Sequence, residues 1–261
     1  PPPPPPLFSS RRRHTRLAIL SRGLGDVYKR QVTDSWDITG KVVERNDVPF
    51  FSGERLEQAF GELEGLQYLE PPVFSAIKHK GRPLYTYARK GVVVDTPPRE
   101  TFIEEFRLVK REGDLLAFEL TCGRGTYVRA VVQEMGRRLG CGACLRSLRR
   151  LQCGRFMIEN ALSLESLEAF IETKRQLEVL LPPAEVLDHL DAYEVERQSE
   201  KKVRHGGPLR DADVGYGDTL RGRLGEMFRI MIGGELAAVA EARSDSQGVF
   251  LQPVRVLLRA A

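Results

Sequence analysis

The chain has no apolar run long enough to cross a bilayer and does not open on a signal-peptide pattern. We therefore expect a cytoplasmic protein with no membrane partner. It also lacks a large excess of one charge, since 40 Lys and Arg against 36 Asp and Glu leave a formal net charge of +4. This balance is a mild indication of a polyanionic partner, and local clusters of cations matter more than the total.

Cysteine is scarce, with four residues in 261. Cys141 and Cys144 form a C-x-x-C pair, a spacing found in zinc and redox sites. A zinc ribbon would need a second close pair, and a redox motif would need a thioredoxin-like βαβ context; the sequence shows neither. We expect free, mostly buried thiols, no metal and no cofactor. A thiol or zinc protein built around this pair is the alternative.

The first 31 residues differ in composition from the rest of the chain. Residues 1–6 are a proline tract, residues 11–13 are arginines, and residues 27–31 read Val-Tyr-Lys-Arg-Gln. One interpretation is a basic arm that binds nucleic acid. The interpretation that we favour is foreign sequence, translated from a sequencing adapter joined in frame. Under either interpretation we expect residues 1–31 to be disordered or loosely packed.

From residue 32 onward the sequence predicts a mixture of strands and helices. Apolar residues at helical spacing predict an amphipathic helix over residues 53–65. Thr126 is predicted to cap a second helix, which Gly140 terminates. The remaining predictions are strands over 41–44, 99–110, 115–122 and 145–153, and helices over 83–90 and 163–171.

Pro182-Pro183 interrupts this pattern and marks the predicted domain boundary. Beyond it, glycines separate short apolar runs such as 228–232 and 236–240, a spacing typical of a small β barrel. The predicted fold class is α+β: a mixed, largely antiparallel sheet with flanking helices, followed by a small β-rich domain at the C-terminus.

Between residues 74 and 90 the chain alternates aromatic rings and cations. Cations contact phosphates and rings stack on unpaired bases, so this segment is a candidate RNA-binding surface. A solvated basic hairpin with Tyr85 or Phe74 facing the core is the structural alternative. A second basic cluster comprises Arg137, Arg138, Arg146, Arg149, Arg150 and Arg155. The candidate RNA contacts are Phe74, Lys78, Lys80, Arg82, Tyr85, Arg89, Arg149 and Arg150.

Three segments carry a resemblance to a known family: residues 123–129 (Gly-Arg-Gly-Thr-Tyr-Val-Arg), residues 71–78 (Pro-Pro-Val-Phe-Ser-Ala-Ile-Lys) and residues 148–150 (Leu-Arg-Arg). Together they resemble the bacterial TruB-type tRNA pseudouridine-55 synthases. The resemblance implies a foreign or disordered leader over 1–31. It further implies a partial catalytic domain over 32–182, with an RNA-binding insertion at about 70–98, and a PUA-like RNA-binding domain over 183–261.

The resemblance also implies an activity and a set of roles. It implies an isomerase that converts a T-loop uridine to pseudouridine, with the T-arm of tRNA as partner, acting as a monomer. Arg129 would pair with the catalytic aspartate of the family and lower its pKa. Tyr127 would form a wall of the uracil pocket, and Leu148 would contact the flipped base. Outside this resemblance, Tyr127 and Arg129 suggest packing and a surface ion pair, and Leu148 suggests a core residue.

The aspartate of this family lies in a Gly-His-x-Gly-x-Leu-Asp-Pro type motif, followed by a Lys-x-Tyr-like element. Neither occurs in this sequence. Asp34 and Asp37 lack the flanking residues of that motif, so we assign them turn and cap hydrogen bonds. We therefore expect this chain to be the C-terminal part of such a synthase. We expect it to be inactive and to lack strands of the central sheet. The alternative function is a non-catalytic tRNA-binding or folding module on the same scaffold.

Overall fold

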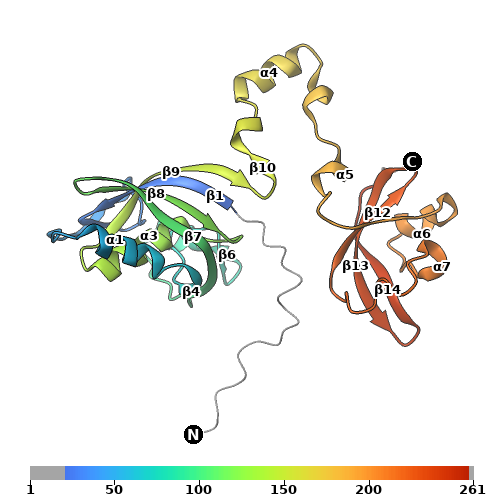
Figure 1. The fold of residues 1–261 in the computed structure, drawn as a ribbon, viewed down its shortest axis with the longest axis horizontal. Coiled ribbons are helices and arrows are strands. Elements are labelled where there is room, and N and C mark those ends of the chain that lie inside the picture. Colours follow the sequence, from blue (N-terminus) through green and yellow to red (C-terminus); the bar gives the residue numbers. More distant parts are fainter. Residues whose placement is uncertain (1–20, 259–261) are drawn as a thin grey trace, which may run out of the picture. The chain divides into compact units, whose positions relative to one another are not determined.

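The computed structural model describes residues 21–258, which form two compact units (Figure 1). One unit comprises residues 21–161 and the other residues 162–258. The division therefore precedes Pro182-Pro183, where the sequence predicts a domain boundary. The proline tract and the arginine cluster of the predicted leader lie outside the described residues. No helix among residues 21–258 combines the length and the apolar character needed to span a membrane.

The first unit is built on a six-stranded antiparallel sheet with the order β10-β9-β1-β8-β7-β4. Two helices, α1 and α3, contact each other and the sheet, and both contribute buried residues to one core. The elements of this layer are β1 (Ser21–Lys29), α1 (Gly53–Gly61), β4 (Gly65–Leu69), β7 (Arg99–Glu112), β8 (Leu115–Cys122), α3 (Val128–Leu139), β9 (Ala143–Cys153) and β10 (Phe156–Met157).

Two short antiparallel ladders extend from this layer. One follows β1 directly, and the other belongs to the segment that the sequence predicts to contact RNA. Their strands and the neighbouring helices are β2 (Gln31–Thr33), β3 (Val42–Arg45), β5 (Lys78–His79), β6 (Arg82–Pro83), α2 (Leu84–Ala88) and the 3-10 helix η2 (Ile158–Asn160).

The core of this unit lies between the sheet and its two helices. Phe106 of β7 is at its centre, with its ring centroid 4.3 Å from that of Phe60 on α1 and 5.3 Å from that of Phe118 on β8. Helix α3 adds Val131, Val132 and Met135, all fully buried. Aromatic pairs at these distances stabilise the core beyond the apolar area that they bury. The predicted α+β class is confirmed in this unit.

The helix boundaries follow local chemistry. Ser52 caps α1, because its hydroxyl accepts a hydrogen bond from the Arg55 amide at 3.2 Å. Gly140 adopts a left-handed conformation at φ 70° and ends α3, as predicted. The prediction that Thr126 caps α3 is wrong, since Tyr127 occupies the cap position without a side-chain hydrogen bond. The Thr126 amide donates to the Gly123 carbonyl at 3.4 Å, so Thr126 still belongs to the preceding turn.

Strand β1 corrects the expectation that residues 1–31 are disordered or loosely packed. It pairs along its length with β8 on one side and with β9 on the other, and so lies in the interior of the sheet. Alternate residues of the strand are buried, among them Gly23, Gly25, Val27 and Lys29. A strand with partners on both edges has its backbone hydrogen bonds satisfied, which can fix a segment whose side chains contribute little to the core.

The end of β1 nonetheless carries side chains that suit this position poorly. Lys29 is fully buried, and its ammonium nitrogen has no hydrogen-bond partner among the described residues. Burial lowers the pKa of this lysine, and the nearby Arg111 guanidinium lowers it further. Arg30 has a φ of 94°, a conformation that favours glycine. An apolar residue would suit the buried position 29 better, and a glycine would suit the backbone conformation at position 30.

The second unit is β-rich, with a sheet in the order β11-β12-β13-β14, parallel between β11 and β12 and antiparallel elsewhere. Phe228, Ile230 and Leu251 are fully buried in its core. The β-rich character is as predicted, but the described strands form one row and no closed barrel. The strands are β11 (Ala192–Glu194), β12 (Met227–Ile232), β13 (Glu235–Asp245) and β14 (Gly248–Val256).

Helices precede and flank this sheet. Ser163 caps α4 by accepting a hydrogen bond from the Ser166 amide at 3.1 Å, as the sequence predicts. Helix α4 contributes no buried residue. The helices are α4 (Leu164–Glu172), α5 (Pro183–Val186), α6 (Glu200–Arg204) and α7 (Asp211–Val214), with 3-10 helices η3 (Gln176–Val179) and η4 (Arg197–Ser199).

Replacing the buried lysine should stabilise the first unit. We expect Lys29→Met to raise the free energy of unfolding at neutral pH by about 1–3 kcal/mol, because a buried donor without a partner is removed. Between the lowered pKa of folded Lys29 and 10.5, the ordinary pKa of lysine, the unfolded state binds the proton more strongly than the folded state does. The free energy of unfolding of the native protein should therefore rise with pH over this range. The variant should lack this rise. Urea unfolding as a function of pH measures both effects.

The matched control is Lys110→Met, at an exposed position of β7. It should leave the free energy of unfolding nearly unchanged at neutral pH. Equal effects of the two substitutions would contradict the burial of Lys29.

Candidate active site

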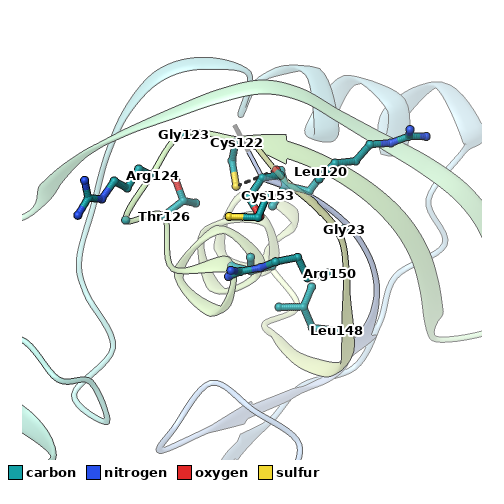
Figure 2. Close-up of a pocket in the computed structure, with 13 residues that line it drawn as sticks. Gly23, Leu120, Cys122, Gly123, Arg124, Thr126, Leu148, Arg150 and Cys153 are labelled. Carbon is teal, nitrogen blue, oxygen red and sulfur yellow. Dashed lines mark hydrogen bonds between the residues drawn. The ribbon is translucent and has the colours of Figure 1, made fainter. Parts of the chain in front are cut away.

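A cavity of about 240 Å³ lies over β1, β8 and β9 (Figure 2). Its walls come from the ends of these three strands and from the turn that leads into α3. Figure 2 shows Leu148, Arg150 and two cysteine sulfurs around it. The lining residues are Ser21, Arg22, Gly23, Leu120, Cys122, Gly123, Arg124, Gly125, Thr126, Val128, Leu148, Arg150 and Cys153.

Glycines of β1 bring the central strands close together beneath this cavity. A Cβ atom at Gly23 would lie 2.8 Å from the Arg149 carbonyl oxygen. A Cβ atom at Gly25 would lie 2.5 Å from the Phe118 ring. Since real Cβ contacts are longer than these, either side chain would push β9 or the core ring aside. The floor of the cavity therefore depends on the absence of side chains at these two positions.

The turn before α3 forms a second wall. The Gly123 amide donates to the Phe102 carbonyl at 2.8 Å, which holds the turn against β7. Gly125 has a φ of 85°, so the backbone reverses where a residue with a side chain would be strained. Arg124 is exposed at this wall and Arg150 at the opposite strand. The cavity thus has an apolar interior with two guanidinium groups available to an anion.

Strand geometry separates residues that are neighbours in sequence. Leu148 pairs with Gly25, Arg149 with Leu24 and Arg150 with Gly23. Because successive residues of a strand face opposite sides, Leu148 and Arg150 share the cavity face and Arg149 lies on the other face. Leu148 is 48% exposed, so it is an accessible cavity wall and not a core residue.

Tyr127 and Arg129 do not belong to the lining of the cavity, although they follow it directly in sequence. Tyr127 is half-buried and packs against the core. The half-buried Arg129 guanidinium donates to the Ser35 carbonyl at 3.1 Å and to the Phe74 carbonyl at 2.9 Å. Arg129 therefore joins α3 to two loops distant in sequence. Its pairing with a catalytic carboxylate stays a prediction.

The two aspartates near residue 35 form turn hydrogen bonds. Asp34 accepts from the Lys41 amide at 2.9 Å, and Asp37 accepts from the Thr39 amide and hydroxyl at 3.0 and 2.7 Å. Trp36, between them, has a φ of 60°. These contacts match the turn role that the sequence suggests for both carboxylates.

The basic segment that follows Phe74 is a hairpin with a short helix. Lys80 and Gly81 form its turn at φ 47° and 80°. The Tyr87 hydroxyl donates to the His79 carbonyl at 3.1 Å, and the two rings meet edge to face. Phe74 is half-buried. The exposed candidate RNA contacts of this segment are Lys78, Lys80, Arg82, Tyr85 and Arg89.

The Arg89 guanidinium lies over the Tyr85 ring, 5.2 Å from its centroid. This contact orients a ring and a cation toward solvent on α2. Tyr85 therefore does not face the core, whereas the half-buried Phe74 is compatible with both interpretations, and the RNA contacts of the segment stay a prediction.

The second basic cluster does not form one stripe. Arg137 and Arg138 both bind Glu134, with N···O distances of 2.7 and 2.8 Å, so they are engaged on α3. Arg149 and Arg150 face opposite sides of β9. Of these arginines only Arg150 reaches the cavity.

A buried carboxylate lies on the sheet face opposite the cavity. Glu119 of β8 is 4% exposed and forms ion pairs with Arg22 and Arg107 from the two neighbouring strands. The Arg22 hydrogen bond is the main reason why the pKa of Glu119 lies below its ordinary value. This cross-strand bridge ties β1 to β8 and β7.

The C-x-x-C pair is buried on β9 and the loop before it, with both thiols free. Burial raises the pKa of Cys141, and raises that of Cys144 to about 11. Among residues 21–258 no group of three or more His, Cys, Asp or Glu is placed to hold a metal ion.

Sequence reasoning missed several cavity residues. Gly23 lies in a segment that we expected to be disordered, although its spacing from Gly25 fits one face of a strand. Cys122 and Cys153 carry no local signal of a shared site, because they are distant in sequence. Their proximity follows from strand order, which no local pattern reveals.

The family comparisons agree with this architecture. The family model for the N-terminal domain of TruB family pseudouridylate synthases matches residues 26–128, beginning inside β1. The model for the C-terminal domain of tRNA pseudouridylate synthase B matches residues 129–188. Together these matches cover the basic segment and the part of the cavity that β8, β9 and the turn before α3 form, whereas Ser21, Arg22 and Gly23 of β1 precede them.

Curated relatives extend this result. The tRNA pseudouridine synthase B of Geobacter sulfurreducens is 39% identical over 212 residues, covering 80% of this chain and 69% of the relative. The tRNA pseudouridine synthase B of Syntrophobacter fumaroxidans is 38% identical over 208 residues, covering 79% and 68%. This chain belongs to the TruB family of pseudouridylate synthases.

Solved structures show the same fold. A chain in the crystal structure of a Cbf5-Nop10-Gar1 complex matches with a TM-score of 0.65 and 19% identity, covering 93% of this chain and 68% of that chain. A chain in an H/ACA RNP bound to a substrate RNA containing 2'-deoxyuridine matches with a TM-score of 0.64 and 17% identity, covering 93% and 67%. These similarities confirm the predicted fold class.

The Glu119 bridge predicts a pH-dependent contribution to stability. Glu119→Gln should lower the free energy of unfolding at neutral pH, because two arginines lose their carboxylate partner. Since the folded pKa is depressed, this contribution is present above the ordinary glutamate pKa of 4.5 and is lost as pH falls through the lower folded value. The difference between native protein and variant should shrink over that acidic range. Glu104→Gln, at an exposed position of β7, is the control; an equal effect there would contradict the bridge.

Proposed function

We propose that this protein is by family a tRNA pseudouridine synthase for a T-loop uridine, that the cavity over β1, β8 and β9 receives the flipped base, and that this polypeptide, without the family's aspartate motif, binds its RNA but does not turn it over. Membership of the TruB family carries this proposal. The cavity supports it, because an accessible leucine and two arginines border an apolar space at the start of α3. Such a space suits a planar uracil ring with a phosphate nearby.

The reaction breaks the bond between uracil N1 and ribose C1′ and forms a bond from C5 to C1′, with no change of oxidation state. It requires a carboxylate nucleophile and a pocket that admits the flipped base. We assign to Arg129 the orientation of that carboxylate. Its guanidinium is half-buried and fixed by two carbonyls, so its geometry is set before substrate binds. We assign to Leu148 a contact with the uracil ring from the cavity wall, and to Tyr127, which lies outside the lining next to Thr126 and Val128, a contact with the same ring when RNA is bound.

We assign binding of the T-arm to the segment from Phe74 to Arg89. Its lysines and Arg82 are exposed around one turn, where they can reach successive phosphates. The Tyr85 ring with the Arg89 guanidinium over it offers a stacking surface for an unpaired base. Arg149 and Arg150 would contact RNA from opposite faces of β9. We further propose a cytoplasmic monomer, with the C-terminal unit as a PUA-like RNA-binding domain.

A non-catalytic tRNA-binding or folding module is the second candidate. The observation in its favour is that residues 1–261 contain no Gly-His-x-Gly-x-Leu-Asp-Pro motif. Binding and chemistry therefore need separate measurements.

The purified chain should bind a T-arm stem–loop more tightly than an anticodon stem–loop of equal length, because the proposed contacts fit the T-arm. Fluorescence anisotropy at fixed salt measures this preference. Release of tritium from RNA labelled at uridine C5 measures pseudouridine formation. We expect binding without release, since the family's aspartate motif is not in the sequence. Release would establish the enzyme in this polypeptide and contradict the expectation of inactivity, and failure to prefer the T-arm would contradict the proposed function.

Removing the cations of the hairpin should weaken binding through lost phosphate contacts. For Lys78→Ala/Lys80→Ala/Arg82→Ala we expect weaker tRNA binding at every salt concentration. The slope of log affinity against log salt should fall by about one for each lost contact. The control Lys41→Ala/Lys110→Ala/Lys174→Ala removes three exposed cations elsewhere and should retain the native slope. An unchanged slope in the hairpin variant would rule out phosphate contacts there.

A further inference from the structure

Strand β4 is the last strand of the six-stranded sheet, so one of its edges has no neighbouring strand in the described part of the chain. On its other edge it pairs with β7, and Leu66 lies directly opposite Phe102. The Phe102 carbonyl accepts a hydrogen bond from the Gly123 amide at 2.8 Å, on the side of β8. Opposed residues of an antiparallel pair alternate between those that exchange hydrogen bonds and those whose backbone groups point away from each other. The backbone groups of Leu66 therefore point toward the free edge of β4, and so do those of Tyr68, two residues further along.

These backbone groups are available to a further strand. Among residues 21–258 no turn, loop or side chain forms a hydrogen bond with the N–H or C=O of Leu66 or Tyr68. The apolar side chains at this edge are accessible, since Leu66 is 41%, Tyr68 61% and Phe102 46% exposed. Successive residues of a strand alternate between its faces, so Leu66 and Tyr68 share the face opposite that of the buried Leu69. Phe102 lies on the same face as its partner Leu66. We name the side chains of Leu66, Tyr68 and Phe102 the edge strip.

The other face of this edge also has room for side chains. A cavity of about 320 Å³ lies between β4 and α3. Its border includes Gln67 and Leu69 of β4, Gln133 of α3, and Trp36. An added strand directs alternate side chains to the two faces, so one set would contact the edge strip and the other would enter this cavity.

Carboxylates surround the edge strip. Glu64 lies two residues before Leu66, and Glu70 lies two residues after Tyr68. Glu100 is directly opposite Tyr68 on β7, and all three glutamates are exposed. This negative charge disfavours contact with a phosphate backbone and favours lysine or arginine on a partner.

The same charges disfavour a second copy of this chain as the partner. The register that satisfies all the free groups of two β4 strands pairs Leu66 with Tyr68 of the second copy, about a twofold axis at Gln67. This register also places Glu64 opposite Glu70 of the second copy. Like charges directly opposite each other are destabilising.

We propose that the free edge of β4 binds an extended segment of a partner protein by strand addition. The segment carries apolar residues at alternate positions and a lysine or arginine at each end. Its backbone completes the hydrogen bonds of Leu66 and Tyr68, its apolar side chains cover the edge strip, and its cations lie near the flanking glutamates. This site is separate from the cavity over β1, β8 and β9, and it does not depend on the proposed function.

A short peptide tests the site on the native full chain. The probe is fluorescein-labelled Lys-Thr-Val-Thr-Val-Thr-Lys, whose lysines and valines fall on one face of an extended strand. Fluorescence anisotropy at low salt should show saturable binding of one peptide per chain. Methylation of both valine backbone nitrogens removes the donors that face Leu66 and Tyr68 and keeps every side chain, so it should abolish binding. Replacing both lysines of the peptide by glutamates should also abolish it.

Protein variants locate the binding site. Tyr68→Ser removes a ring of the edge strip, and Glu70→Lys reverses a flanking charge, so each should weaken peptide binding several-fold. The effect of Glu70→Lys should shrink as salt rises. The matched controls are Val43→Ser, at an exposed apolar position of β3, and Glu57→Lys, at an exposed position of α1. Both controls should keep the native affinity.

Binding of the N-methylated peptide, or native affinity in both edge variants, would overturn the proposal. Absence of any peptide binding would overturn it too, and so would a dimer of the native chain that Tyr68→Ser dissociates in sedimentation velocity. The comparison of peptides uses only the native chain, so it remains decisive where Tyr68→Ser fails to fold. No RNA enters these experiments, so their outcome is distinct from that of the proposed function.

Discussion

The hydrogen bonding of β1 to two neighbours is the constraint on which the site depends. This strand joins β8 to β9, which carry the two sides of the cavity, and its glycines let both approach. The Glu119 bridge fixes the same strand from the opposite face. A shift of β1 by one residue would exchange its two faces and place Arg22 and Leu24 under the cavity. The register of a single strand therefore determines the shape of the pocket.

The position of β1 could not be predicted from its own residues. Glycines, a lysine and an arginine weaken any strand pattern, and the same residues suggested foreign sequence. What holds the strand is its backbone pairing, which depends on two strands more than 80 residues later in the chain. The buried Lys29 and the strained Arg30 show local preference and tertiary position in conflict. Where local preference and tertiary position agree, as in α1, β7, β8 and the Gly140 end of α3, the sequence predicts the elements well.

The distinction between local sequence preference and tertiary position also applies to the residues of the site. Leu148, Arg149 and Arg150 all belong to a segment that carries the family resemblance, and Leu148 and Arg150 line the cavity. The alternation of side chains along β9 places Arg149 on the other face. The nearness of the two cavity cysteines could not be predicted for the opposite reason, since 30 residues lie between Cys122 and Cys153 in the chain and one strand lies between them in the sheet. Contacts within one helix or strand can be predicted from the spacing of residues in the sequence. Contacts across a sheet can be predicted only when the order of its strands is known.

The contacts of Arg129 are structural, and they are compatible with the catalytic role that we propose for it. Its two carbonyl partners come from the turn around Trp36 and from the start of the segment that we propose to bind RNA. These bonds hold both loops against α3, so binding of RNA to that segment would act directly on the position of the guanidinium. A guanidinium carries more N–H donors than two carbonyls use, and its fork is rigid and always charged. An arginine held in this way can orient a carboxylate without a rearrangement of its own, whereas a lysine would lose one loop contact to gain the other.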